Sequence, residues 1–250
     1  MASALFRKLE TAFVAPRYLT LPAIGLDLST SGVKGAFLAE RAHGLELARF
    51  NDIRFPSAAF ADGDIVDRGV VVKALRDMSS YFGVRTANVA LPESKSYLFE
   101  THAEGATKSE WRTVVEQHLD GYIPLPPAEV AFDIVPVGHD AEGIKLVGVG
   151  YARRIVEEVL NVCDEAGLRV RALESETFAG ARALCPFGDT TSVLIIDIGK
   201  TTTKLIIATG GVPRFATTVG IGGQSLTLAV QKHFGVTETE ARRVKLAHGI

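Results

Sequence analysis

The sequence predicts an α/β protein in which one small motif occurs twice, once in each half of the chain. In the first copy, a short apolar run over residues 23–27 ends in Asp27, and a turn of small polar residues and a returning strand follow. In the second copy, the apolar run 192–196 leads to Asp197 and a similar turn and strand. A repeated organisation of this kind indicates two related lobes. The 250 residues accommodate them, since domains usually contain about 100–200 residues.

The composition is that of a globular protein with a hydrophobic core. Apolar residues make up 47% of the chain and charged residues 22%, which are ordinary values. The net charge of -2 argues against a nucleic-acid binder, because phosphate contacts require clustered basic side chains. Cys163 and Cys185 lack the spacing of a metal site, which favours a reducing compartment. No apolar run reaches the length of about 18 residues that a membrane-spanning helix needs.

Residues 1–21 form a segment that precedes the first motif. Its apolar residues recur at helical spacing, and they are Leu5, Phe6, Leu9, Ala12 and Phe13. Charged residues interrupt the segment, so it does not have the pattern of a signal peptide. We expect an amphipathic helix, which either packs on its own domain or lies on a membrane surface.

The pattern of the remaining chain predicts three further parts. Residues 22–94 and 172–190 are predicted to form the first lobe. Its strands are expected at 33–38, 45–50 and 88–91, and its helix at 70–82. Residues 95–171 are predicted to form a separately packed α+β insert, with strands at 97–101, 130–135, 144–148 and 169–173. Its helices are expected at 109–119, with Ser109 as N-cap, and at 155–166, ended by Gly167. Residues 191–250 begin the second lobe, with a hairpin turn at Gly210 and Gly211 and a helix from Ser225.

The two Asp-containing turns have the chemistry of phosphate-binding hairpins. Backbone N–H groups in a tight turn of small residues can hold phosphate oxygens. An aspartate at the end of the strand suits Mg²⁺, usually through water. Two such hairpins facing each other across a cleft would hold the phosphates of a nucleotide between the lobes. The alternative is a pair of ordinary hairpins in which Asp begins the turn, but a glycine-rich loop at 220–223 that opens a helix favours the phosphate interpretation.

Five stretches together resemble the PilM family of type IV pilus assembly proteins, which are actin-like and related to FtsA. They are residues 24–34 (IGLDLSTSGVK), 122–130 (YIPLPPAEV), 166–168 with 176–179 (AGL and ETFA), 197–203 (DIGKTTT) and 221–227 (IGGQSLT). The resemblance runs from about residue 22 to the end of the sequence. It implies an actin-like ATPase fold, of the ribonuclease H-like kind, with a small α+β inserted subdomain, and ATP and Mg²⁺ as cofactors.

The resemblance also implies roles for individual residues. Asp27 and Asp197 would be the carboxylates on the magnesium side, and Glu176 would orient water. The residues expected to line the phosphates are Ser29, Thr30, Ser31, Lys34, Gly199, Thr201 and Thr202. Gly222 and Gly223 would approach the nucleotide closely, and Lys245 lies on a helix that meets the nucleoside in relatives. Residues 237–240 of that helix also match an ordinary capping box.

The sequence departs from the family pattern at two places. Ser29 stands where the family usually has glycine, which would crowd a phosphate. The sequence ends at Ile250, whereas members of the family continue through the rest of the second lobe and an adenosine-binding loop. We therefore expect an incomplete second lobe and weak binding of ATP.

The resemblance implies a cytoplasmic scaffold at the inner-membrane face, part of the type IV pilus assembly complex and at most a weak ATPase. Its expected partner is the N-terminal cytoplasmic peptide of a PilN-like inner-membrane protein, bound in a groove of the first subdomain. Self-association is a further expectation, and nucleic acid is not an expected partner. Two alternatives remain open. A small-molecule kinase of the same fold would need a carboxylate that acts as base on a substrate hydroxyl, and an actin-like domain of a type II secretion component would carry a transmembrane segment downstream.

Overall fold

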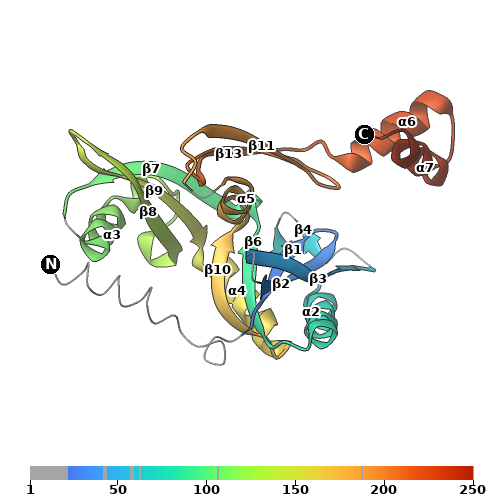
Figure 1. Cartoon of the computed structure of the whole chain (residues 1–250), viewed down its shortest axis with the longest axis horizontal. Coiled ribbons are helices and arrows are strands. Elements are labelled where there is room, and N and C mark those ends of the chain that lie inside the picture. The colour runs from blue at the N-terminus through green and yellow to red at the C-terminus, as the bar shows by residue number, and fades with distance from the viewer. Residues whose placement is uncertain are drawn as a thin grey trace.

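The first lobe is built on a five-stranded mixed sheet (Figure 1). The computed structural model describes residues 22–249 except 42–43, 57–58, 62, 106 and 187, so the helix expected within 1–21 lies outside the described residues. The sheet has the strand order β10 (Arg169–Ser175), β6 (Thr86–Leu91), β1 (Ile24–Ser29), β2 (Gly32–Arg41) and β3 (Gly44–Arg54). A short hairpin of β4 (Phe60–Ala61) and β5 (Asp64–Ile65) follows β3.

Helices α2 (Arg68–Phe82) and α4 (Arg153–Glu165) pack on one face of this sheet. On β1, Ile24, Leu26 and Leu28 are buried in the core that these helices complete. Because successive side chains of a strand point to opposite faces, the side chain of Asp27 lies on the other face. The alternation within β1 thus places the first motif's carboxylate away from the core.

The insert has its own sheet and its own core. Its strands β7 (Ser96–Ala103), β9 (Gly143–Ala152) and β8 (Val130–Asp140) are antiparallel and lie in the order β7-β9-β8. Helix α3 (Lys108–Gln117) packs on β7, and Phe99, Leu119 and Ile134 belong to a hydrophobic cluster separate from that of the first lobe. Short 3-10 turns lie at Glu93–Lys95, Leu119–Gly121 and Pro127–Glu129.

Three details of the insert differ from the sequence-based expectation. The helix expected at 155–166 is α4, whose buried residues Val159, Val162 and Cys163 belong to the core of the first lobe. The N-cap of α3 is Thr107 and not Ser109, because Thr107 and Glu110 form a reciprocal capping box. The strand expected at 169–173 is β10, which pairs in parallel with β6 in the five-stranded sheet and does not join the insert sheet. Parallel strands require a long crossover, and the insert together with α4 forms that crossover. The proposed boundaries of the insert and of the other domains remain predictions.

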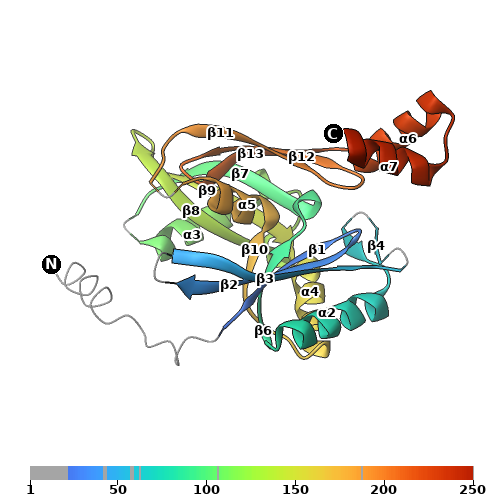
Figure 2. The same cartoon turned by 45° about the vertical axis from the view of Figure 1, so that its right-hand side comes forward.

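The second lobe begins with a three-stranded antiparallel sheet, formed by β11 (Ser192–Ile198), β12 (Thr203–Thr209) and β13 (Val212–Val219). Gly210 and Gly211 both have left-handed φ values, 61° and 75°, as a tight hairpin turn requires. Helices α6 (Gly223–Phe234) and α7 (Glu238–His248) follow and form a pair beyond the end of the sheet (Figure 2). The capping box expected at 237–240 is present at the start of α7.

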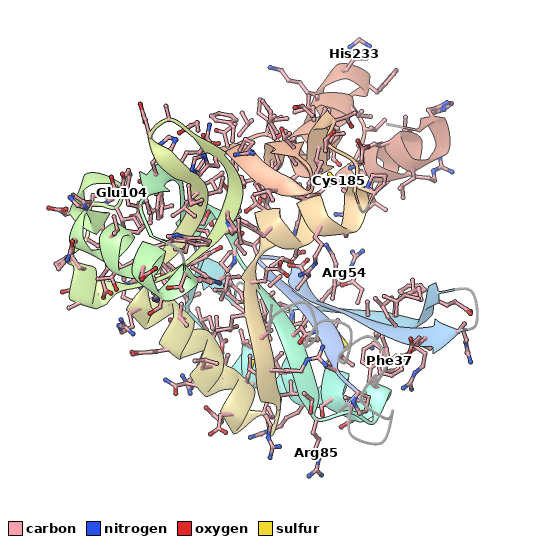
Figure 3. All side chains as sticks on the ribbon, turned by 60° about the vertical axis from the view of Figure 1, so that its left-hand side comes forward. Phe37, Arg54, Arg85, Glu104, Cys185 and His233 are labelled. Carbon is pink, nitrogen blue, oxygen red and sulfur yellow. The ribbon has the colours of Figure 1, made fainter. Side chains whose placement is uncertain are left out.

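Helix α5 (Glu176–Leu184) lies between the two lobes. It contacts β6 and β10 of the first lobe and β12 and β13 of the second. Figure 3 shows Cys185, just after α5, between the lobes, with Glu104 on the insert and His233 on the helical pair. Within the described part of the chain, none of the helices has the length and apolar character needed to cross a membrane.

Candidate functional site

The second Asp-containing turn is held by the loop that opens α6. Within the turn, the N–H of Gly199 donates to the carbonyl of Thr202 at 2.8 Å. From the loop, the N–H of Gly223 donates to the carbonyl of Gly199 at 2.9 Å, and the N–H of Gln224 donates to the carbonyl of Lys200 at 2.8 Å. The turn and the start of the helix therefore form one hydrogen-bonded unit.

Gly222 is required by this unit itself. A Cβ atom at Gly222 would lie 2.7 Å from the backbone nitrogen of Thr202 and 2.8 Å from the carbonyl oxygen of Gly199. A Cβ atom at Gly223 would have its nearest neighbour at 3.4 Å, the Nζ atom of Lys245. In the structure, Gly222 lies close to the second turn. That Gly222 and Gly223 also approach a nucleotide closely stays a prediction.

The first turn is held by its own side chains. The hydroxyl of Ser29 donates to the carbonyl of Gly32 at 3.1 Å and lies 3.1 Å from the hydroxyl of Ser31. Thr30, at the tip, is exposed. The ammonium of Lys34 lies 3.6 Å from a carboxylate oxygen of Asp27. The serine that departs from the family pattern thus takes part in closing the turn.

Glu176 and Lys204 form the most buried ion pair near the two turns. Glu176 is the first residue of α5, and one of its carboxylate oxygens accepts a hydrogen bond from the ammonium of Lys204 on β12. The other oxygen accepts from the backbone N–H of Glu93 at 3.2 Å. Only 18% of the Lys204 side chain and 21% of the Glu176 side chain are exposed. The pair joins the second lobe to the helix between the lobes.

Lys204 also interacts with both of the aspartates that the sequence singles out. Its Nζ atom lies 3.6 Å from a carboxylate oxygen of Asp197. Burial lowers the pKa of Lys204, but the negative charges of Glu176, Asp197 and Asp27 outweigh burial and raise that pKa above its ordinary value. The three residues predicted to be catalytic, Asp27, Glu176 and Asp197, therefore all attract the ammonium group of Lys204. Lys204 is not among the site residues that the sequence predicted. The signal was present, since Lys34 and Lys204 each follow their aspartate by the same interval.

The remaining predicted residues have less direct relations to the site. A broad hollow of about 1470 Å³ on the open face of the five-stranded sheet is lined by Asp27 and Lys34 but not by Asp197, so a single cleft lined by both aspartates stays a prediction. Lys245 donates to the carbonyl of Gly223 at 2.8 Å and to the hydroxyl of Thr227 at 3.0 Å, which ties α7 to α6. Thr201 is exposed and Thr202 partly buried in the second turn.

The site does not offer Mg²⁺ a set of free carboxylates. Among the described residues, no group of three or more His, Cys, Asp or Glu side chains is arranged to hold a metal ion. Mg²⁺ prefers an octahedral shell of oxygen atoms. At Glu176, an ion bound directly to the oxygen that pairs with Lys204 would have to displace its ammonium.

Comparison with solved structures shows which class of protein the two lobes and the hairpins define. The PilM-PilN type IV pilus biogenesis complex is matched with a TM-score of 0.76 at 21% identity, over 93% of this chain and 70% of that one. The cytoplasmic domain of EpsL from the type II secretion system of Vibrio cholerae is matched with a TM-score of 0.54 at 15% identity, over 86% and 77%. MreB5 of Spiroplasma citri bound to ADP is matched with a TM-score of 0.50 at 17% identity, over 90% and 62%.

These likenesses confirm the predicted actin-like ATPase fold. The family model for the type IV pilus assembly protein PilM matches residues 25–250. The chain therefore belongs to the PilM family, as the five motif stretches indicated. The family match favours a component of pilus assembly over a small-molecule kinase or a type II secretion component, although EpsL shares the fold.

Proposed function

We propose that this chain is an actin-like scaffold of the type IV pilus inner-membrane assembly complex. In this proposal it lies in the cytoplasm at the inner-membrane face and binds the N-terminal peptide of a PilN-like membrane protein. The match to the PilM family over residues 25–250 carries the proposal. The similarity to a chain solved in a PilM-PilN complex supports the choice of partner.

A groove between the insert and the first lobe is the place we propose for the peptide. A hollow of about 440 Å³ lies there, and its wall is formed by β8, β9, β10 and α5. Its apolar lining includes Val135, Leu173 and Phe178. Arg182 and Glu174, which form an ion pair at 2.5 Å, supply charge beside these apolar side chains. The lining therefore combines apolar contact with a few charged groups, as peptide-binding grooves do.

The strands beside the groove favour an extended peptide. Both β8 and β10 are edge strands of their sheets. Consecutive residues line the hollow on each strand, 131–133 on β8 and 172–175 on β10. Since consecutive side chains point to opposite faces of a sheet, the edge of each strand borders the hollow. Unpaired N–H and C=O groups at such an edge can pair with an added strand. On β8 the carbonyls of Val130 and Phe132 already accept from Arg153 and Arg112, so β10 is the edge we favour for this pairing.

A substitution on β8 tests the groove. Ala131→Arg would place a long charged side chain in the hollow, and we expect affinity for a synthetic PilN-like N-terminal peptide to fall by about tenfold or more, equivalent to about 1.4 kcal/mol. The matched control is Ala141→Arg, at the exposed turn between β8 and β9, which should leave the affinity unchanged. Fluorescence anisotropy with labelled peptide measures both. Equal affinities for the two variants would place the peptide elsewhere.

The proposal includes nucleotide binding at the two hairpins, with at most weak ATPase activity. The backbone of each turn, with the hydroxyls of Ser29, Thr30, Ser31, Thr201 and Thr202, would hold the phosphates. Mg²⁺ would accompany the phosphates and supply positive charge to them. The likeness to MreB5, which was solved with ADP, supports nucleotide binding, and Gly199, Gly222 and Gly223 hold the backbone of the second turn in place.

Hydrogen exchange tests the nucleotide proposal. Millimolar Mg-ATP should slow exchange of backbone amides at residues 29–32 and 199–202, since phosphates would accept hydrogen bonds from them. Adenosine, which has no phosphate, should not slow exchange at either turn. Unchanged exchange with ATP, in a chain that still binds the peptide, would make this protein a scaffold that works without nucleotide.

A further inference from the structure

We propose that Lys204 is the resident cation of the hairpin site. Its ammonium, in place of a divalent metal ion, balances the charge of Glu176 and Asp197 and fixes the second hairpin against α5. Lys204 is thus a positioning residue for the phosphate-binding turn. The inference does not depend on nucleotide binding, because it concerns the carboxylates and their counter-charge in the chain alone.

The position of the ammonium carries the first step of the argument. Lys204 lies on β12, and its Nζ atom donates to Glu176 on α5 and lies 3.6 Å from Asp197 on β11. Asp27, on β1 of the other lobe, adds a longer-range attraction. One ammonium therefore contacts carboxylates from two elements, α5 and β11, which is the role that a bound cation has between acidic side chains.

Burial makes this counter-charge necessary. A carboxylate that is mostly removed from water is costly unless it is paired and hydrogen-bonded. Glu176 is mostly buried and satisfied on both oxygens, by Lys204 on one and by the N–H of Glu93 on the other. The hydroxyl of Thr218 on β13 in turn donates to the carboxylate of Glu93. Burial raises the pKa of Glu176 and the Lys204 ammonium opposes that rise, so without the ammonium the carboxyl group would take up a proton more readily.

The first hairpin provides a natural comparison. Lys34 stands in the same place relative to Asp27 as Lys204 does to Asp197. The Lys34 side chain is 59% exposed, against 18% for Lys204, and it pairs with Asp27 at 3.6 Å. Exposed pairs contribute little because water and salt screen them. The two lysines therefore occupy equivalent positions with different functions, and only Lys204 replaces an ion.

The same geometry explains why a free divalent ion would be excluded. An ion bound directly to Glu176, whose side chain is only 21% exposed, would lie close to the Lys204 ammonium, and like charges a few ångströms apart repel strongly where water is scarce. The ammonium is attached to the chain and does not dissociate, so its local concentration does not depend on the solution. Removal of metal ions should therefore leave the contact between β12 and α5 intact.

Binding of Mn²⁺ to the 250-residue chain without nucleotide tests the proposal. We expect no saturable Mn²⁺ site in the unaltered chain, as followed by electron paramagnetic resonance of the free ion. Lys204→Met keeps most of the side chain's volume and removes its charge. We expect this variant to gain a saturable Mn²⁺ site, at least about tenfold tighter than any weak, non-saturating binding by the unaltered chain, because the repulsion from the ammonium is gone.

Two controls make the result specific. Lys34→Met removes the exposed lysine and should not create a Mn²⁺ site, and Lys204→Arg keeps the charge and should not either. A folded Lys204→Met chain that gains no Mn²⁺ affinity overturns the proposal. The proposal is also overturned if the unaltered chain binds Mn²⁺ and the Asp197→Asn variant does not. This comparison remains decisive even if Lys204→Met does not fold. Failure to bind ATP would contradict the nucleotide proposal and leave this result unaffected.

Discussion

Replacement of Leu75 by alanine is expected to lower the free energy of unfolding by about 2–5 kcal/mol, the cost of removing a large side chain from a tightly packed core. Leu75 lies on α2, is fully buried, and belongs to the core that also contains Ile24 of β1 and Met78. Its removal would leave a cavity in the core between α2 and the five-stranded sheet. Urea denaturation followed by circular dichroism measures the loss.

Leu160→Ala is the matched control for this experiment. Leu160 lies on α4, which packs on the same sheet, but its side chain is 39% exposed. Removing exposed apolar atoms opens no closed cavity, so we expect a change of less than about 1 kcal/mol. Equal losses for the two variants would show that α2 does not supply the centre of the first lobe's core.

Gly222→Ala is expected to separate α6 from the second hairpin. The added methyl group would lie 2.7 Å from the nitrogen of Thr202 and 2.8 Å from the oxygen of Gly199, closer than carbon atoms approach backbone atoms. The φ of Gly222, −147°, is accessible to alanine, so the effect comes from the contact and not from backbone strain. We expect a loss of about 1–3 kcal/mol, typical of overpacking. Native-state hydrogen exchange should show faster exchange at Gly223 and Gln224, whose N–H groups bond to the turn.

Gly223→Ala provides the comparison one residue further on. Its methyl group would have only ordinary contacts, the closest being the Nζ atom of Lys245 at 3.4 Å. Gly223 is the first residue of α6, where the preference for alanine over glycine is smaller than the value of about 0.5–1 kcal/mol in a helix interior, so this variant should be close to neutral. If Gly222→Ala and Gly223→Ala change hydrogen exchange at the turn to the same extent, the close contact at Gly222 does not explain why glycine occupies that position.

Several features of this protein follow from short stretches of its sequence. The alternation of Ile24, Leu26 and Leu28 places Asp27 on the face of the sheet away from the core. Gly210 and Gly211 produce a hairpin turn because both need positive φ values. The capping box of α7 has its partners only three residues apart. In each case the interacting groups are close neighbours in the chain, so the local pattern contains the information.

Tertiary structure decided the features that depend on distant residues. The strand pattern at 169–173 was correct, but only pairing with β6 showed that it belongs to the first lobe and not to the insert. Nothing local distinguishes an exposed lysine from a buried one, so the sequence alone does not separate Lys204 from its counterpart Lys34. The role of Lys204 depends on Glu176, which precedes it by 28 residues, and on the packing of α5 that buries both. Periodicity in a sequence reports which face a side chain occupies, whereas the charge partners and burial of that side chain are set when separate elements pack together.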